Sequence, residues 1–223
     1  MITLTEENYL KNILVLSTEK GYVPVNVLSH ELNIKMPTVN SMMKRLTDKD
    51  LVYFEPYKPI RLTEKGKIEA ALILRRHRLT ETFLFEKMGL GWEHVHPIAE
   101  QIEHIQSTLF FDKMDEMLNF PKADPHGEPI PTKEGVILPL SQTRLSEHKA
   151  GETVCFTAVN DSSEEFLKFL NNKNLKLGTA IKIESIELYD GSLTIAYENR
   201  HEILSKIVAD KMLVEIIKEE TVI

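Results

Sequence analysis

The first 63 residues alternate apolar and polar positions in the manner of a small helical domain followed by a hairpin. Apolar side chains recur at helical spacing in three segments, residues 5–18, 25–32 and 38–49. Thr5 is a candidate N-cap for the first segment, and a turn at Gly21 separates it from the second. A short helix, a tight turn and a longer helix make a helix-turn-helix pattern, and the strand-like segments 51–55 and 60–63 predict a β-wing after it.

The middle of the chain predicts two long helices. Residues 64–88 form one helical run, ended by the glycines that follow, and His96-Pro97 begins a second run that continues to about Leu118. The first run holds more apolar surface than a single core needs, which is typical of a subunit interface. Its arginines, within residues 75–78, lie on the other side, where we expect solvated charges.

A proline-rich segment and a small β module follow. Residues 120–139 contain five of the ten prolines, which predicts a linker. His126 in this linker is a candidate for a further metal ligand, but a proline-rich loop favours an exposed side chain. After it, short apolar runs predict strands over residues 153–159, 180–188, 193–197 and 213–217. A capping box at residues 162–165 is expected to open a helix that runs to about Lys173, and Asp190-Gly191 predicts a hairpin turn. Several short strands around a small core favour an SH3-like barrel.

Composition places the chain among ordinary globular proteins. With 223 residues, 42% of them apolar, it has room for one large or two to three small domains with real cores. No run of about 18 apolar residues occurs and the N-terminus is acidic, so we expect neither a membrane span nor a secretion signal. The single Cys155, inside a strand-like run, predicts a buried inert thiol. We therefore expect a cytoplasmic protein.

Charge is distributed unevenly along the chain. The net charge is −7, yet residues 1–78 carry 13 Lys and Arg against 9 Asp and Glu, whereas residues 79–223 carry 14 against 25. A basic first segment on an acidic body suits a protein that touches nucleic acid through that segment alone. The third predicted helix has small hydrogen-bonding residues near its start and bases further on, as a recognition helix does. The candidate DNA-binding residues are Pro37, Thr38, Asn40, Ser41, Lys44 and Arg45.

The two middle helices carry the residues with the clearest chemistry. On the second helix, four side chains fall within one arc of roughly 100°, opposite an apolar arc. These four are His96, Glu100, Glu103 and His104. One helix upstream, His77 and Glu81 are spaced i, i+4 and project from one side. Imidazoles and carboxylates at this spacing are what a divalent transition metal needs from two packed helices.

A solvated polar face is the ordinary explanation of such a pattern. Solvated faces normally include lysine and arginine, however, and residues 92–112 contain neither, so the acceptors there lack a local counter-charge. His77 and Glu81 also share their arc with apolar side chains, which indicates partial burial, and a buried acid needs a partner. A bound cation accounts for both observations, and we therefore expect a metal site.

Three motifs, taken with the order of the predicted parts, resemble a known family. They are Arg-His-Arg-Leu-x-Glu at 76–81, His-x3-Glu-x2-Glu-His at 96–104 and Asp-Pro-His-Gly-x-Pro-Ile-Pro at 124–131. The whole chain resembles the diphtheria-toxin-repressor family of iron- and manganese-dependent transcriptional repressors. The resemblance implies a mainly α protein with a small β module, a multi-domain α+β architecture. Its expected parts are a winged helix-turn-helix DNA-binding domain (1–63), a helical dimerisation and metal-binding domain (64–119), a linker (120–146) and an SH3-like domain of the FeoA type (147–223).

The resemblance also implies function. We expect a repressor, not an enzyme, that binds double-stranded operator DNA as a homodimer when loaded with metal, controls metal-homeostasis genes and takes no small-molecule substrate. Two metal sites per subunit are implied. One matches His77, Glu81 and His96, with Glu165 and Ser162 of the barrel as candidate oxygen ligands. The other, regulatory site matches Asn8, Glu100, Glu103 and His104.

Two positions bear on the identity of the metal. Iron-type members of the family carry Met and Cys at the positions of Asn8 and Glu100, whereas manganese-type members carry Asp and Glu. The sulfurs are absent here, and because hard oxygen donors suit Mn²⁺, we expect manganese, with Fe²⁺ as the alternative. Asn8 is a weaker, neutral ligand than Asp, and Lys11 stands where manganese-type members often have Glu.

Two other classes of function fit parts of the pattern. A metalloenzyme with a carboxylate-bridged pair of ions would use similar donors, but it would also need a substrate cleft and a spare general base. A helix-turn-helix regulator that senses an organic ligand would bind DNA regardless of chelators. Titration of DNA binding against metals and EDTA distinguishes these classes.

Overall fold

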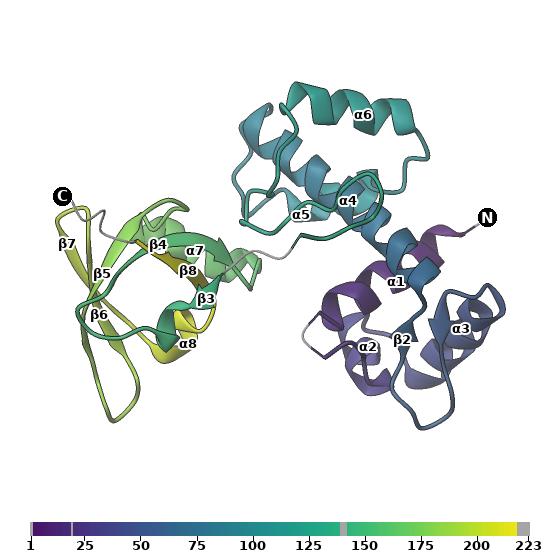
Figure 1. The fold of residues 1–223 in the computed structure, drawn as a ribbon, viewed down its shortest axis with the longest axis horizontal. Helices are drawn as coiled ribbons and strands as arrows, with labels where there is room; N and C mark the ends of the chain where they lie inside the picture. The colour runs from purple at the N-terminus through teal and green to yellow at the C-terminus, as the bar shows by residue number, and fades with distance from the viewer. Residues whose placement is uncertain (1, 19, 139–141, 218–223) are drawn as a thin grey trace, which may run out of the picture.

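The first part of the chain folds into three helices and a short hairpin (Figure 1). The computed structural model describes residues 2–18, 20–138 and 142–217. The elements are α1 (Leu4–Leu16), α2 (Val25–Glu31), α3 (Met36–Asp48), β1 (Val52–Tyr53) and β2 (Arg61–Leu62). The two strands pair antiparallel, with Val52 opposite Leu62, and form the predicted wing.

The first helix begins earlier than predicted, because its N-cap is Thr3 and not Thr5. The Thr3 hydroxyl accepts from the backbone N–H of Glu6, and the Glu6 carboxylate accepts from the backbone N–H of Thr3. This reciprocal pair is a capping box, and it needs Glu or Gln three residues after the cap. Thr5 has Asn8 at that place and so cannot complete the pair.

The core of the first body includes one end of the long helix α4 (Glu64–Glu86). Ile13 of α1, Leu46 of α3 and Ile73 of α4 are all buried in the same cluster. Thr63 caps α4 by accepting from the backbone N–H of Gly66. Because α4 shares this core and continues beyond it, the helix fixes the DNA-binding body relative to the middle of the chain (Figure 1).

The second long helix predicted for the middle of the chain is in fact two helices, α5 (His96–Ile102) and α6 (Thr108–Met117). One contact from another helix and one cap within the chain accompany the break. The guanidinium of Arg76 donates to the carbonyl of Glu103 at 2.6 Å, and Ser107 caps the new helix by accepting from the backbone N–H of Phe110. Both contacts satisfy backbone groups that helix ends leave unpaired.

The arginines of α4 are ion-paired and largely buried, and the prediction that they are solvated is wrong. Arg75 contacts Asp115 at 2.6 Å and Arg76 contacts Glu7 at 3.0 Å. Arg78, whose side chain is 7% exposed, contacts Glu128 at 2.8 Å. These pairs tie α4 to α6, to α1 and to the proline-rich segment respectively.

The proline-rich segment lies against both α4 and the barrel. Arg78 donates to the carbonyl of Pro129 at 2.6 Å, and the backbone N–H of Val159 donates to the carbonyl of His126 at 2.9 Å. His126 is only 2% exposed, so the prediction that it is exposed is wrong. Residues 139–141 of the expected linker lie outside the described residues.

The last part of the chain is a barrel-like sheet with the strand order β3-β8-β4-β5-β6-β7. Its elements are β3 (Thr143–Arg144), the 3₁₀ helix η1 (Leu145–Glu147), β4 (Thr153–Val159), α7 (Glu164–Lys173), β5 (Ala180–Ile186), β6 (Leu193–Tyr197), β7 (Arg200–Leu204), α8 (Lys206–Ala209) and β8 (Met212–Ile216). All neighbouring strands are antiparallel, and Asp190-Gly191 makes the predicted hairpin between β5 and β6.

The barrel differs from the prediction in one helix cap and in four elements that were not predicted, β3, η1, β7 and α8. The side chain of Ser163, the N-cap of α7, makes no cap bond, and the Asp161 carboxylate accepts from the backbone N–H of Ser163 in its place. Strand β7 was not predicted, since its sequence is mostly polar and only Leu204 is buried. Within the described part of the chain, no helix is long and apolar enough to cross a membrane.

Candidate metal centre

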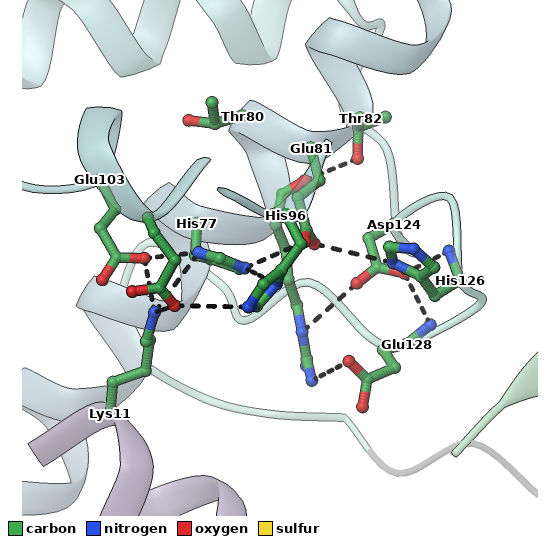
Figure 2. Close-up of polar contacts among 12 residues, drawn as sticks. Lys11, His77, Thr80, Glu81, Thr82, His96, Glu103, Asp124, His126 and Glu128 are labelled. Carbon is green, nitrogen blue, oxygen red and sulfur yellow. Dashed lines mark hydrogen bonds and ion pairs between the residues drawn. The ribbon is translucent and has the colours of Figure 1, made fainter. Parts of the chain in front are cut away.

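Glu81 lies between two groups of donor side chains, as Figure 2 shows. It projects from α4 and is 2% exposed. Its Oε1 atom is 3.0 Å from Nε2 of His77 and 3.1 Å from Nδ1 of His96. Its Oε2 atom faces the proline-rich segment and is 3.8 Å from Nδ1 of His126. The buried Glu81 carboxylate therefore contacts imidazoles of candidate metal ligands on both of its sides.

The first group of donors contains His77, His96 and Glu100, whose ligand atoms all lie within 4.8 Å of one another. The two imidazole rings meet edge to face with centroids 4.8 Å apart. Nε2 of His96 is 3.6 Å from a Glu100 oxygen. The predicted His77–Glu81–His96 set is therefore brought together, but Glu100 joins it from the set that was expected to be separate.

The second group contains Glu81, Asp124 and His126, all buried and with ligand atoms within 4.8 Å of one another. Asp124 was not predicted as a ligand, and His126 was expected to be exposed, whereas both are buried. The detectable signal was Gly127, which has φ +84° and whose Cβ, if present, would lie 2.1 Å from the carbonyl oxygen of Thr157. Only glycine permits this approach, and the approach is what buries the two preceding donors.

The electrostatics of the site are dominated by burial and by neighbouring carboxylates. Burial opposes the charged form of His77, but the carboxylates of Glu81 and Glu103 outweigh it and raise the pKa of His77 to about 9. Burial, together with the negative charges of Glu81 and Glu128, raises the pKa of Asp124 to about 7 despite the nearby Arg78. Burial acts to raise the pKa of Glu81, but contact with His77 outweighs it and leaves that pKa lowered.

The four residues expected to form the regulatory site lie near one another, but each contacts different partners. Glu103 is fully buried and lies 2.5 Å from Nδ1 of His77. His104 turns toward α1, where its Nδ1 is 2.6 Å from a carboxylate oxygen of Glu7, a residue that the sequence analysis did not single out. The amide oxygen of Asn8 is buried without a hydrogen-bond partner. Both Glu100 and Glu103 contact Lys11.

The expected barrel ligand Glu165 is exposed on α7. Ser162, in contrast, lines a cavity of about 560 Å³ together with His77, Glu81 and His96. The same cavity is lined by Lys11 of α1, by His126 and by Asp161, which precedes α7. Residues of the helical body and of the barrel therefore line the same cavity, next to the candidate metal ligands.

The donor set fits a hard divalent cation. Among the described residues, three buried oxygens near the donors lack a hydrogen bond: Asn8 Oδ1, Glu103 Oε1, which is 3.7 Å from His104, and Asp124 Oδ2, which is 3.5 Å from Arg78. Buried acceptors are nearly always satisfied, and a cation would satisfy these. The donors of both groups are imidazole nitrogens and carboxylate oxygens, without sulfur.

The candidate DNA-binding residues lie on α3, away from its buried side. Val39, Met43 and Leu46 face the core, whereas the candidates are exposed or half-buried. The candidates are Pro37, Thr38, Asn40, Ser41, Lys44 and Arg45. Arg45 also lies 3.6 Å from Glu6 of α1.

Family models match three consecutive stretches of the chain. Residues 1–60 match the N-terminal DNA-binding domain of iron-dependent repressors, and residues 63–132 match their metal-binding and dimerisation domain. Residues 143–216 match the FeoA domain. The chain is 35% identical to the iron-dependent repressor IdeR of Mycobacterium tuberculosis over 128 residues, which are 57% of this chain and 55% of that protein. The match thus spans about half the length of that relative.

A second curated relative is covered more fully, and solved structures are covered almost completely. The HTH-type transcriptional regulator MntR of Geobacillus thermodenitrificans is 30% identical over 56% of this chain and 87% of its own length. A manganese-dependent transcriptional repressor in complex with manganese superposes with a TM-score of 0.87 at 26% identity, covering 95% of this chain and 99% of that one. IdeR of T. acidophilum gives 0.78 at 28% identity, covering 97% of this chain and 100% of that one.

A winged helix-turn-helix, a helical body with buried imidazoles and carboxylates, and a small barrel together define a class of three-part metal-binding regulators. The matches narrow this class further. The chain belongs to the iron-dependent repressor family, the family of the diphtheria toxin repressor, and both the expected resemblance and the expected fold class are confirmed.

Proposed function

We propose that this protein is a metal-dependent transcriptional repressor that binds operator DNA as a homodimer when loaded with Mn²⁺ and controls genes of metal homeostasis. Fe²⁺ is the alternative metal. The observation that carries the proposal is the buried Glu81 carboxylate, flanked by imidazoles on both sides and linked through Glu103 and Lys11 to the first helix. The proposal is supported by the family, whose members are iron-dependent repressors with a DNA-binding domain and a metal-binding and dimerisation domain.

The chain's geometry suggests how metal would act on DNA binding. Helix α1 packs in one core with the recognition helix α3, and α1 also reaches the donors through Lys11 and Glu7. A cation that neutralises carboxylates on α4 and α5 would favour one position of α1 relative to them. The docking geometry of α3 would follow, because both helices move with the same core.

We propose two metal sites per subunit. The first would use His77, Glu81 and His96, with Glu100 at their edge and Glu165 as a contribution from the barrel. The regulatory site would use Asn8, Glu100, Glu103 and His104. The structure adds Asp124 and His126, which share Glu81 with the first site.

Manganese is favoured because the donors are hard. Carboxylate oxygens suit Mn²⁺, imidazole nitrogens bind most divalent transition metals, and thiolate would favour later and softer metals. Replacing Glu100 with cysteine is therefore expected to shift activation from Mn²⁺ toward Fe²⁺, Co²⁺ or Ni²⁺. An unchanged order of activating metals in Glu100→Cys would show that another residue sets the preference.

The proposed dimer would form through the helical body. Large apolar side chains are exposed along its helices, including Met88 after α4 and Leu109 and Met117 of α6, which are 61%, 67% and 58% exposed. Exposed apolar surface of this kind is typical of a subunit interface. Paired recognition helices could then reach half-sites about one helical turn, or multiples of it, apart.

The test is fluorescence anisotropy on labelled promoter DNA. Protein stripped with EDTA and dialysed would be titrated with Mn²⁺, Fe²⁺ and Zn²⁺ under anaerobic conditions. We expect operator binding only with metal and its loss on adding excess EDTA. If the stripped protein binds the promoter as tightly as the loaded protein does, the repressor proposal fails. Light scattering in the same buffers tests the dimer.

A further inference from the structure

The ammonium group of Lys11 lies among three of the proposed metal ligands, as Figure 2 shows. Its Nζ atom donates to Glu100 at 2.5 Å and to Glu103 at 2.8 Å, and it is 3.4 Å from Nδ1 of His77. The Lys11 side chain projects from α1 and is only 6% exposed. The two carboxylates that it contacts belong to α5 and to the C-cap of that helix. The Lys11 ammonium group is therefore the cation that pairs with the Glu100 and Glu103 carboxylates.

We propose that Lys11 is a built-in competitor of the regulatory metal: its ammonium holds Glu100 and Glu103 in the metal-free protein and must leave before a divalent cation can bind them. The inference rests on the proposed function and adds to it a residue that sets the metal threshold. A divalent ion and an ammonium group cannot share these oxygens, because two cations about 4 Å apart in a buried site repel strongly.

The environment of Glu103 explains why a cation is needed there at all times. Its side chain is fully buried, and an unpaired buried carboxylate is costly. Lys11 and His77 satisfy Oε2, yet Oε1 has no hydrogen-bond partner. The lysine therefore satisfies the carboxylate only in part. A cation that engages both oxygens would stabilise it further, so displacement of Lys11 is favourable once metal is abundant.

The lysine also has a place to go. Lys11 lines the cavity of about 560 Å³, and Glu31 of α2 lines the same cavity. A lysine stem has four rotatable methylene groups, so the ammonium can move out of the cluster into this space while α1 keeps its position. The exchange requires rotamer changes of one side chain and no rearrangement of the core.

The proposal is tested by Lys11→Met, which keeps the apolar stem and removes the charge. Isothermal titration of MnCl₂ into EDTA-stripped, dialysed protein is expected to show Mn²⁺ binding about tenfold tighter than wild type, or one more ion per chain. The stripped variant is also expected to melt several degrees below wild type, because Glu103 loses its partner. The matched control is Lys206→Met, which removes an exposed lysine paired with Asp210 and should leave the wild-type isotherm unchanged.

The outcomes separate this inference from the proposed function. Equal number and affinity of Mn²⁺ in wild type and Lys11→Met overturn the inference but leave the repressor proposal intact. Absence of Mn²⁺ binding in both proteins overturns the two together. A tighter isotherm for Lys206→Met as well would show a general charge effect, and the specific role of Lys11 would be rejected.

A second measurement uses the wild-type protein and does not depend on the folding of a variant. Acetylation by an N-hydroxysuccinimide ester, followed by mass spectrometry of the peptide that contains Lys11, reports whether this amine is accessible. We expect Lys11 to be protected in EDTA and modified several times faster with saturating Mn²⁺, whereas Lys206 reacts at the same rate in both. Continued protection of Lys11 at Mn²⁺ saturation overturns the exchange.

Discussion

The imidazole of His126 lies parallel to the indole of Trp92, with ring centroids 6.1 Å apart and an angle of 13° between the planes. The Nε2 atom of the same imidazole is 3.0 Å from the carbonyl of Trp92, and its Nδ1 atom faces Glu81. Trp92, from the loop between α4 and α5, is buried in the core of the barrel. One histidine thus touches both the donor cluster and the contact that joins the helical body to the barrel.

Because Trp92 is the single tryptophan of the chain, intrinsic fluorescence reports on this contact directly. We expect Mn²⁺ added to stripped protein to change the tryptophan emission with the same midpoint as the binding isotherm. His126→Ala should abolish most of the change, whereas His201→Ala, at an exposed histidine of β7, should not. A constant emission in wild type, despite calorimetric Mn²⁺ uptake, would contradict the placement of an ion beside His126.

The stability of the metal-free protein is expected to fall between about pH 6.5 and pH 9. The pKa of His77 is raised from 6.5 to about 9, so the folded state retains a proton that the unfolded state has lost throughout this interval. The stabilisation is complete below pH 6.5 and is lost as the pH passes 9, a difference on the order of 3 kcal/mol. Denaturant melts at several pH values measure it.

His77→Gln should flatten this pH dependence, and His94→Gln, at a half-exposed histidine, should keep it. With Mn²⁺ the sign should reverse, since a metal binds the neutral imidazole and its stabilising effect grows as the proton leaves. A metal-free protein that becomes more stable from pH 6.5 to pH 9 would contradict the assigned pKa shift.

Gly127 is expected to be irreplaceable, in contrast to another glycine of similar conformation. Gly127→Ala forces a Cβ against the carbonyl oxygen of Thr157, so the segment must leave β4. Gly151 has φ +93° with no atom within 4 Å of the position a Cβ would take, so Gly151→Ala should cost only about 1–2 kcal/mol of backbone strain. We expect the first variant alone to lose Mn²⁺-dependent fluorescence. Comparable behaviour of the two variants would show that the packing of this segment does not organise the donors.

The recognition helix should divide its residues between phosphate and base contacts. Lys44→Ala is expected to weaken binding to all sequences alike and to lower the slope of log affinity against log salt by about 1. Asn40→Ala and Ser41→Ala should relax specificity at particular base pairs, by about 1–3 kcal/mol each, with little change in the salt slope. Anisotropy with a panel of single-substituted operators distinguishes the two effects. A uniform loss for all three variants would refute the division.

The sequence predicts the elements better than it predicts their ends and contacts. The spacing of apolar residues is a local property: helical spacing correctly indicated α1 to α4, and short apolar runs indicated the wing and four of the six barrel strands. The break between α5 and α6 depends on Arg76 reaching the carbonyl of Glu103 from another helix. Strand β7 depends on its pairing with β6, since its own residues are largely polar. Tertiary contacts determine such features, and the spacing of residues along the chain gives no information about those contacts.

The candidate site shows the same division. His77, Glu81 and His96 do lie within contact distance of one another, as their spacing suggests, because two of them lie on one regular helix and the third starts the next. His126 was misplaced because proline-rich composition predicts exposure, whereas its burial depends on Gly127 approaching a distant strand. The sequence singled out Lys11 by its position, but it did not predict that its ammonium group contacts Glu100 and Glu103, because those carboxylates lie about 90 residues further along the chain.

The two oxygens of Glu81 face different histidines, so ions bound on both of its sides would share one carboxylate, and their binding would be interdependent. Electron density drawn toward an ion beside His77 and His96 is withdrawn from the oxygen that faces His126, and two divalent ions joined by one carboxylate also repel each other. Filling of the two sides is therefore expected to be anticooperative. A cell containing this protein would then read metal over a wider concentration range than a single site covers, responding gradually and not as a sharp switch.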